Sequence, residues 1–437
     1  MAPTFLKSKL LSRKAHSLIP GGAHTYAKGD DQYPIQAPGF IACGEGCRVW
    51  DIDGNAFIEY GMGLRAVTLG HGYRPVVEAA YKYMMMGTNF TRPAPIEVEC
   101  AEELLGLIES GDMAKFAKDG SDANTAAIKL ARAYTGKDLI ARCADQPFFA
   151  TDDWFMGSTS MSAGIPQCVR DLTVQFRYND LDSVRALFDQ FPRKIACVVL
   201  EAATTVEPKD DFLIRLQQLC EREGVVFILD EMITGFRWDL HGAQKCYGIK
   251  PHLSTFGKAM ANGFSVSALV GRREIMELGG LEHEKERVFL LSTTHGAETH
   301  ALAAAKETMQ IYKRENVISY LYRQGERLRN GIRQAVESLE LQDYFEVLGR
   351  APNLIYATRD EAKRPSQAFR ALFLQETIRR GLLIPSLVVS FSHTDSDIDQ
   401  TVDAIADALV VYKKALYHGV EKYLVGRSVQ PVFRKFN

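Results

Sequence analysis

Between about residues 120 and 300, short apolar runs alternate with amphipathic stretches along the chain. Residues 211–224 space their apolar side chains for a helix, and Gly224 suits its end. Continuously apolar strands joined by helices predict a mostly parallel sheet that is covered on both faces. Four runs have the length and the aliphatic character of strands: 139–143 (LIARC), 195–201 (IACVVLE), 225–231 (VVFILDE) and 266–271 (VSALVG).

A further helix is predicted over residues 121–136, where Gly136 suits the C-terminal stop. Residues 48–60 alternate around an Asp-Gly pair, which is typical of a β-hairpin. After about residue 310 the pattern changes to amphipathic helices with a few short strands. We therefore expect a large α/β domain over 66–310 and a smaller α+β domain that the chain ends, 1–65 and 311–437, build together. The stripe of the helix over 121–136 consists of Ala123, Ala127, Leu130, Ala131 and Tyr134.

Composition and charge exclude several classes of protein. The 437 residues are 46% hydrophobic, and 52 Lys and Arg nearly balance 54 Asp and Glu, so no net field favours nucleic acid or an anionic membrane. No stretch approaches the ~20 consecutive apolar residues that span a bilayer, and the N-terminus lacks a continuous apolar segment, so we expect a cytoplasmic protein. The eight cysteines form no C-x-x-C pair, which predicts reduced core residues and neither disulfides nor a metal site.

Three chemical features follow predicted strands, where the ligands of open α/β sheets bind. Gly120 and Ser121 lie at the start of a predicted helix, and this start is either an anion-binding site or an ordinary helix cap. Asp230 ends a buried strand, which is costly unless the carboxylate meets a cation or caps a turn. Lys258 follows the predicted strand over residues 253–256 and is flanked by Gly257 and other small residues. It is either a solvated cation in a loop or an amine held in a crowded site.

Together these features are what a pyridoxal 5'-phosphate site requires. The lysine forms a Schiff base with the cofactor's aldehyde, and the carboxylate keeps the pyridine nitrogen protonated so that the ring accepts electrons. The N–H groups at the helix end hold the phosphate. Each feature alone has an ordinary structural explanation, but their combination favours the cofactor site.

Three motifs carry a resemblance to a known family: DGSDANTAAIKLARAYTG from residue 119, LDEMITGFR from 229 and TFGKAMANG from 255. The chain resembles the fold-type I, class III aminotransferases, and within them the subgroup similar to glutamate-1-semialdehyde aminomutase. The resemblance extends from LIPGGAHTY at residue 18 to SHTDSDID at residue 392. It implies a large domain with a mostly parallel seven-stranded sheet, pyridoxal phosphate as cofactor, and a homodimer with its sites at the subunit interface.

The resemblance also implies roles for individual residues. Asp230 pairs with the pyridine nitrogen, and Lys258 is the Schiff-base lysine and proton shuttle. Gly120 and Ser121 contact the phosphate, as does Thr294, which reaches into the neighbouring subunit's site. The ring-stacking aromatic is Phe148, with Phe149 at the family's usual histidine, and Met232 lies on the other face of the ring.

The departures from the subgroup concern the substrate. Aminomutases use a serine and an arginine for the substrate carboxylate, whereas Thr25 and Lys28 stand here, and a lysine cannot grip a carboxylate with a planar fork. The acidic residue before the HTD stretch is missing, and the loop over residues 151–166 is shorter than the aminomutase lid. Polar groups expected near the entrance or the substrate are Thr25, Tyr26, Lys28, Asp153, Trp154, Glu201 and Glu298.

The sequence therefore predicts a transaminase that moves an amino group from glutamate, through pyridoxamine phosphate, to a carbonyl acceptor. Similar proteins imply a sugar-like or polyol acceptor of surface-polysaccharide or secondary metabolism. The main alternative is glutamate-1-semialdehyde 2,1-aminomutase. A third alternative, a catalytically silent protein that binds the cofactor, is disfavoured because Lys258 and Asp230 are both intact.

Overall fold

The computed structural model describes residues 3–436, which form two compact units. The first consists of the chain up to Tyr73 together with Ser319–Arg434, and the second consists of Arg74–Ile318 with the last residues from Lys435. One unit is thus built from both ends of the chain and the other from its middle. The second unit begins and ends eight residues later than the large domain expected from the sequence (74 against 66, and 318 against 310).

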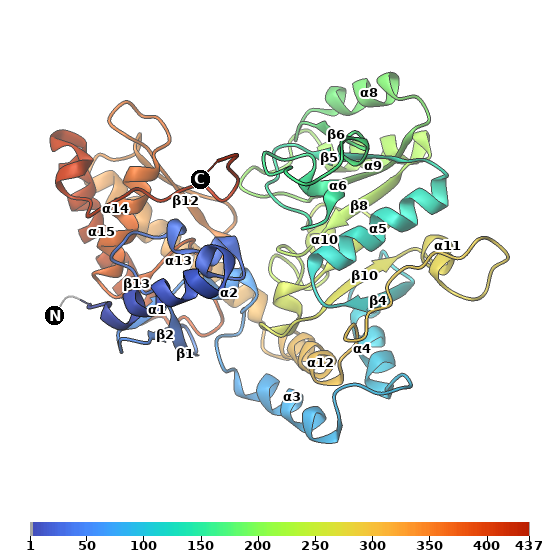
Figure 1. Ribbon diagram of the computed structural model, residues 1–437, viewed down its shortest axis with the longest axis horizontal. Helices are drawn as coiled ribbons and strands as arrows, with labels where there is room; N and C mark the ends of the chain where they lie inside the picture. The colour runs from blue at the N-terminus through green and yellow to red at the C-terminus, as the bar shows by residue number, and fades with distance from the viewer. Residues whose placement is uncertain (1–2, 437) are drawn as a thin grey trace. The chain divides into compact units, whose positions relative to one another are not determined.

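A seven-stranded sheet organises the second unit (Figure 1). Strands β9, β8, β7, β5 and β6 pair in parallel, and β10 is antiparallel to both of its neighbours, β9 and β4. The sheet is therefore mostly parallel, as predicted. In spatial order its strands are β4 (Met113–Ala117), β10 (Ser267–Gly271), β9 (Leu253–Phe256), β8 (Val226–Asp230), β7 (Ile195–Glu201), β5 (Leu139–Cys143) and β6 (Thr173–Phe176).

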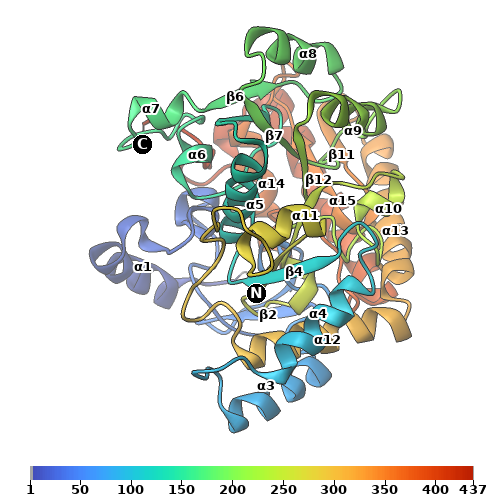
Figure 2. The ribbon, with the colours of Figure 1, turned by 90° about the vertical axis from the view of Figure 1, so that its right-hand side faces the viewer.

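Helices cover both faces of this sheet. Alternate residues such as Leu229 join the core under α8 and α9, and the intervening residues face α5, because side chains along a strand alternate between faces. Helices α3, α4 and α12 pack together beside the sheet (Figure 2). The helices are α3 (Arg74–Met86), α4 (Pro95–Leu105), α5 (Gly120–Thr135), α6 (Asp153–Met156), α7 (Gln167–Arg170), α8 (Leu181–Gln190), α9 (Phe212–Glu223), α10 (Ala243–Cys246), α11 (Arg273–Met276) and α12 (Thr299–Arg314).

The predicted ends of two helices have a common physical basis. Gly136 follows α5 with φ 66°, and Gly224 follows α9 with φ 60°, both in the left-handed region that only glycine enters without cost. The predicted strands lie at β5, β7, β8, β9 and β10. One position of the α5 stripe differs: Tyr134, in the last turn, is exposed.

The first unit contains the predicted hairpin, in which β2 pairs antiparallel with β3. Residues between the two strands include Gly54 with φ 92°, as an Asp-Gly turn requires. Strand β13 adds to β3 in parallel, so segments from both chain ends share one sheet. The elements are α1 (Leu6–Leu18), β1 (Ile41–Glu45), β2 (Arg48–Asp51), β3 (Ala56–Glu59), α2 (Met62–Arg65), α13 (Val317–Ser338), β11 (Phe345–Leu348), β12 (Ile355–Thr358), α14 (Gln367–Ile378), β13 (Leu382–Leu383) and α15 (Asp395–His418).

The cysteines are only in part the core residues that the sequence predicts. All eight are free thiols, but Cys43, Cys168 and Cys246 are exposed, so the prediction of burial is wrong for these three. Among the described residues, no helix is both long and apolar enough to cross a membrane.

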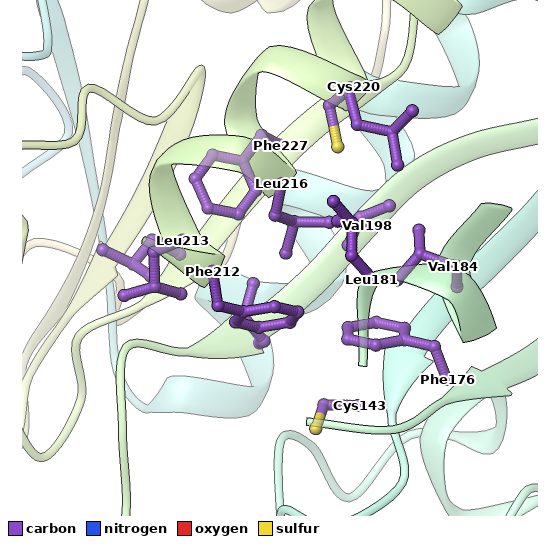
Figure 3. Packing of buried hydrophobic residues seen from close by; sticks show 14 of the residues in the cluster. Cys143, Phe176, Leu181, Val184, Val198, Phe212, Leu213, Leu216, Cys220 and Phe227 are labelled. Carbon is purple, nitrogen blue, oxygen red and sulfur yellow. The ribbon is translucent and has the colours of Figure 1, made fainter. Parts of the chain in front are cut away.

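We expect Leu216→Ala to destabilise the protein by about 2–5 kcal/mol, because it removes a fully buried side chain of α9 from the core that also holds Phe212 and Phe227 (Figure 3). Denaturant unfolding measures the effect. The control is Ile214→Ala on the same helix, whose side chain is 38% exposed and for which the loss should stay near ~0.5 kcal/mol. Equal losses in both variants would contradict this packing.

Candidate active site

The carboxyl ends of β7 and β8 bring two buried carboxylates side by side. Glu201 and Asp230 are the last residues of these strands and are paired in register, and Asp230 is paired in turn with Thr255 of β9. Their exposed fractions are 4% for Glu201 and 3% for Asp230. Parallel strands thus collect polar side chains at one edge, as open α/β sheets do at their ligand sites.

Asp230 is held by a hydrogen bond at each carboxylate oxygen. Oδ2 accepts from Asn124 Nδ2 at 2.8 Å, and Oδ1 accepts from the Met232 main-chain N–H at 2.8 Å. Burial raises the pKa of the Asp230 carboxyl, and the nearby Lys258 ammonium, the Met232 N–H and the Asn124 amide act against that rise. The carboxylate is therefore oriented and close to a cation in a site with little water.

Lys258 begins the turn that follows β9. Its φ is +41°, in the left-handed region that a residue with a side chain rarely adopts, so the backbone is strained at this position. The preceding Gly257 has an extended φ of 179°, and it is a glycine for a different reason: a Cβ there would lie 2.7 Å from Met232 Sδ. The glycine before Lys258 thus lies against the side chain of Met232, which follows Asp230 by two residues.

The N-terminus of α5 meets the same methionine. A Cβ on Gly120 would lie 3.0 Å from Met232 Sδ, so Met232 lies against both Gly120 and Gly257. The helix is capped by Asp119, whose Oδ1 accepts from the Asp122 N–H at 3.0 Å. Ser121 Oγ accepts from the Thr151 N–H at 3.0 Å. The N–H groups of Gly120 and Ser121 lie in the first turn of the helix, before the capped position, and unbonded N–H groups at a helix start are a common type of anion site.

The loop with the two phenylalanines is tied to the strand ends by side-chain amides. Gln146 both accepts from the Glu201 N–H and donates to the Glu201 carbonyl, each at 2.8 Å. Asn124 Nδ2 donates to the Phe149 carbonyl at 2.8 Å. Phe149 is fully buried, whereas Phe148 is 44% exposed.

The segment after this loop is anchored internally. Buried Arg142 donates from Nε to Ser158 Oγ at 2.6 Å and from Nη2 to the Ser158 carbonyl at 2.8 Å. Trp154 Nε1 donates to Thr125 Oγ1 at 2.8 Å. Trp154 is 6% exposed and holds the segment onto α5, whereas its neighbour Asp153 is exposed. Their place near the substrate entrance stays a prediction.

Two further predicted residues lie before α12. Thr294 is exposed, and its carbonyl accepts from Asn89 Nδ2 at 2.8 Å. Glu298 forms an ion pair with Lys118 at 2.6 Å, and this hydrogen bond lowers the pKa of Glu298 below its ordinary value. Its carboxylate is thus already engaged by a neighbour.

The remaining substrate candidates, Thr25, Tyr26 and Lys28, belong to the first unit, where all three are exposed. The second unit therefore brings together Asp230, Lys258, Gly120 and Met232. The contact of Thr25, Tyr26 and Lys28 with a substrate stays a prediction.

Sequence reasoning missed residues that hold the site together. Asn124 and Gln146 are nearly fully buried, and Glu231 is completely buried, where its carboxylate accepts from the N–H groups of Ala243 and Gln244 at 2.9 Å each. Glu231 thereby closes the chain after Met232 into a fixed loop. One signal was available for Asn124, because it is a polar residue on the helix face that buries Ala123 and Ala127.

This set of groups fits a phosphorylated pyridine aldehyde. Asp230 offers a buried negative partner for a ring nitrogen, Lys258 an amine for the aldehyde, and the α5 N-terminus two N–H groups for the phosphate. Within residues 3–436 no cluster of three or more His, Cys, Asp or Glu has the geometry to hold a metal ion.

Comparison with known proteins gives a consistent result. The family described as aminotransferase class-III matches residues 27–409. The chain is 32% identical to glutamate-1-semialdehyde 2,1-aminomutase of Acetivibrio thermocellus, covering 92% of this chain and 97% of that protein. It is 31% identical to 3-aminobutyryl-CoA aminotransferase of Cloacimonas acidaminovorans, with coverages of 94% and 98%. Among solved structures, the FumI protein of Sphingopyxis sp. MTA144, solved in its PLP internal aldimine form, superimposes with a TM-score of 0.86. Its sequence is 26% identical, and the match covers 94% of this chain and 97% of FumI.

We expect Arg142→Met to loosen the segment 153–159, because the variant keeps much of the side-chain volume and loses the hydrogen bonds to Ser158. Amide hydrogen exchange there should speed up by about 5- to 150-fold, the equivalent of two hydrogen bonds of about 0.5–1.5 kcal/mol each. Arg185→Met, at an exposed ion pair of α8, serves as the control. Unchanged exchange in the Arg142 variant would contradict the anchoring.

Proposed function

Because the chain belongs to the class III aminotransferase family and its cofactor is pyridoxal phosphate, we propose that it is a transaminase that moves an amino group from glutamate to a carbonyl acceptor. The observation that carries the chemistry is the buried Asp230 carboxylate beside the Lys258 amine. The cofactor, when bound, supplies an aldehyde and an aromatic ring that accepts the electron pair of the breaking C–H bond.

The chain's own residues then have distinct roles. Asp230 keeps the ring nitrogen protonated, and its two hydrogen bonds aim the carboxylate. Lys258 Nζ binds the aldehyde and afterwards carries the proton that leaves the donor's Cα. Gly120 and Ser121 bind the phosphate through their N–H groups.

Two side chains and the strand ends complete the proposed site. Phe148 and Met232 pack on the two faces of the ring. Glu201 borders the substrate, because its register partner is Asp230. Thr25 and Lys28 are proposed to contact a hydroxylated, sugar-like acceptor, and Glu298 to act through its bond to Lys118.

The anchored segment supports a transaminase over an aminomutase. A mutase has to retain its intermediate through both half-reactions, and a closing lid serves that purpose. Arg142 and Trp154 instead hold the corresponding segment through internal hydrogen bonds, which favours exchange of the first product for an external acceptor.

We also propose a homodimer in which Thr294 reaches the partner's cofactor. Helix α3 and the chain after it expose a large apolar surface, which in a monomer would remain in water. Thr294 is exposed on the same unit. The apolar surface is formed by Val77, Tyr81, Met84, Met85, Met86, Phe90 and Val98.

We expect Lys258→Ala to remain folded, to lose turnover by at least ~10²-fold, and to lose borohydride labelling. Reduction of the cofactor-loaded protein followed by peptide mapping tests this, with the label on the Lys258 peptide of the wild type. Lys250→Ala, at an exposed lysine of the same unit, should be labelled normally. A label on another lysine would refute the assignment, and labelling without any turnover on a panel of donors would favour the silent binding protein.

A second experiment separates transaminase from aminomutase. Glutamate should discharge the visible absorbance of the lysine-linked cofactor and release one equivalent of 2-oxoglutarate per site, because a transaminase needs an external donor. Glutamate 1-semialdehyde alone should yield little aminolevulinate. Rapid aminolevulinate formation without any donor would overturn the transaminase proposal and support the mutase. A panel of ketones and aldehydes, scored by the return of the absorbance, then identifies the acceptor.

A further inference from the structure

Asn124 is a buried amide on an otherwise apolar helix face. It is 1% exposed, and its neighbours on α5 that are buried with it include Ala123 and Ala127. A primary amide in such surroundings is costly unless its polar atoms find partners. The sequence therefore keeps Asn124 at this position for its hydrogen bonds.

Three hydrogen bonds fix the orientation of this amide. Nδ2 donates to Asp230 Oδ2 and to the Phe149 carbonyl, each at 2.8 Å, and Oδ1 accepts from Thr255 Oγ1 at 2.8 Å. Asp230 and the Phe149 carbonyl are both acceptors, and only the NH2 group has two hydrogens to satisfy them. The reverse orientation would set the amide oxygen against two other oxygens.

The three partners belong to three different segments. Asp230 ends β8, Thr255 lies in β9 three residues before Lys258, and Phe149 lies in the loop that presents Phe148. A single amide thus joins the carboxylate, the strand that leads to the lysine and the aromatic loop.

We infer that Asn124 is a positioning residue, which holds the carboxylate for the ring nitrogen and the aromatic loop in one fixed arrangement. The inference rests on the proposed function, since it assigns Asp230 and Phe148 their roles there. Asn124 itself acts through these residues and touches neither substrate nor cofactor. An aspartate of the same size would fail, because it offers two acceptors where two donors are needed.

Loss of Asn124 should change the electrostatics of the site as well as its geometry. A donor to a carboxylate stabilises the charged form, so removing it raises the pKa of Asp230. A carboxylate that is less often ionised leaves the ring nitrogen less often protonated. With less positive charge on the ring, the nitrogen that links Lys258 to the cofactor binds its own proton more tightly.

The test compares wild type, Asn124→Asp, Thr255→Val and the control Gln375→Leu. Gln375 is also a fully buried amide, and both its nitrogen and its oxygen form hydrogen bonds, but it lies in the first unit. Thr255→Val removes only the hydroxyl that orients the Asn124 amide, and it provides a mild variant if Asn124→Asp folds poorly. Each cofactor-loaded protein is measured for the pH titration of its visible absorbance, for cofactor affinity, and for kcat and KM with glutamate.

In Asn124→Asp, kcat should fall by roughly 10- to 100-fold with little change in KM, the scale expected for a lost hydrogen bond to a charged group. The absorbance titration should move to higher pH. Thr255→Val should show the same changes to a smaller degree, and Gln375→Leu should lose stability only. The inference is overturned if the Asn124 and Thr255 variants titrate and turn over like the wild type, or if they behave like Gln375→Leu.

Failure of the proposed function would look different. A wild type that binds the cofactor but does not react with glutamate would refute the donor assignment. The titration and the cofactor affinity of the variants would still decide the role of Asn124.

Discussion

The burial of one carboxylate at the end of β8 determines which groups must surround it in the site. Removing Asp230 from water costs several kcal/mol unless its charge is compensated. The structure compensates it with one N–H donor at each oxygen and with a lysine nearby. These groups hold the carboxylate in one orientation, and this orientation is what the proposed pairing with a protonated pyridine ring requires.

The next residue faces the other way and has a structural role. Side chains alternate along a strand, so Glu231 points away from Asp230 and meets the main chain of Ala243 and Gln244. One carboxylate is thus proposed to serve the cofactor, and its neighbour closes the loop that carries Met232. The two successive buried acids therefore have different hydrogen-bond partners: Asn124 and Met232 for Asp230, and Ala243 and Gln244 for Glu231.

Much of this arrangement can be predicted from local sequence patterns, because helix ends and strands depend mainly on residues that are close in the sequence. Glycine ends α5 and α9, apolar runs form β7 and β8, and Asp230 and Lys258 follow their strands as expected. What the sequence hides are contacts between distant segments. Asn124 meets Asp230 across 106 residues and Thr255 across 131, and no periodicity encodes such pairs. For the same reason the sequence does not show that Trp154 of α6 is buried and bonded to Thr125 of α5.

The contact of Met232 with two glycines makes these three positions a single unit of sequence variation. A Cβ at Gly120 would lie 3.0 Å from the Met232 sulfur and a Cβ at Gly257 would lie 2.7 Å from it, so a side chain at either position requires Met232 to shift. A library that varies these positions one at a time will therefore record the cost of moving Met232 together with the effect of the new side chain. Joint variation with a smaller residue at position 232 removes the need for that shift, so it admits combinations that single substitutions disfavour.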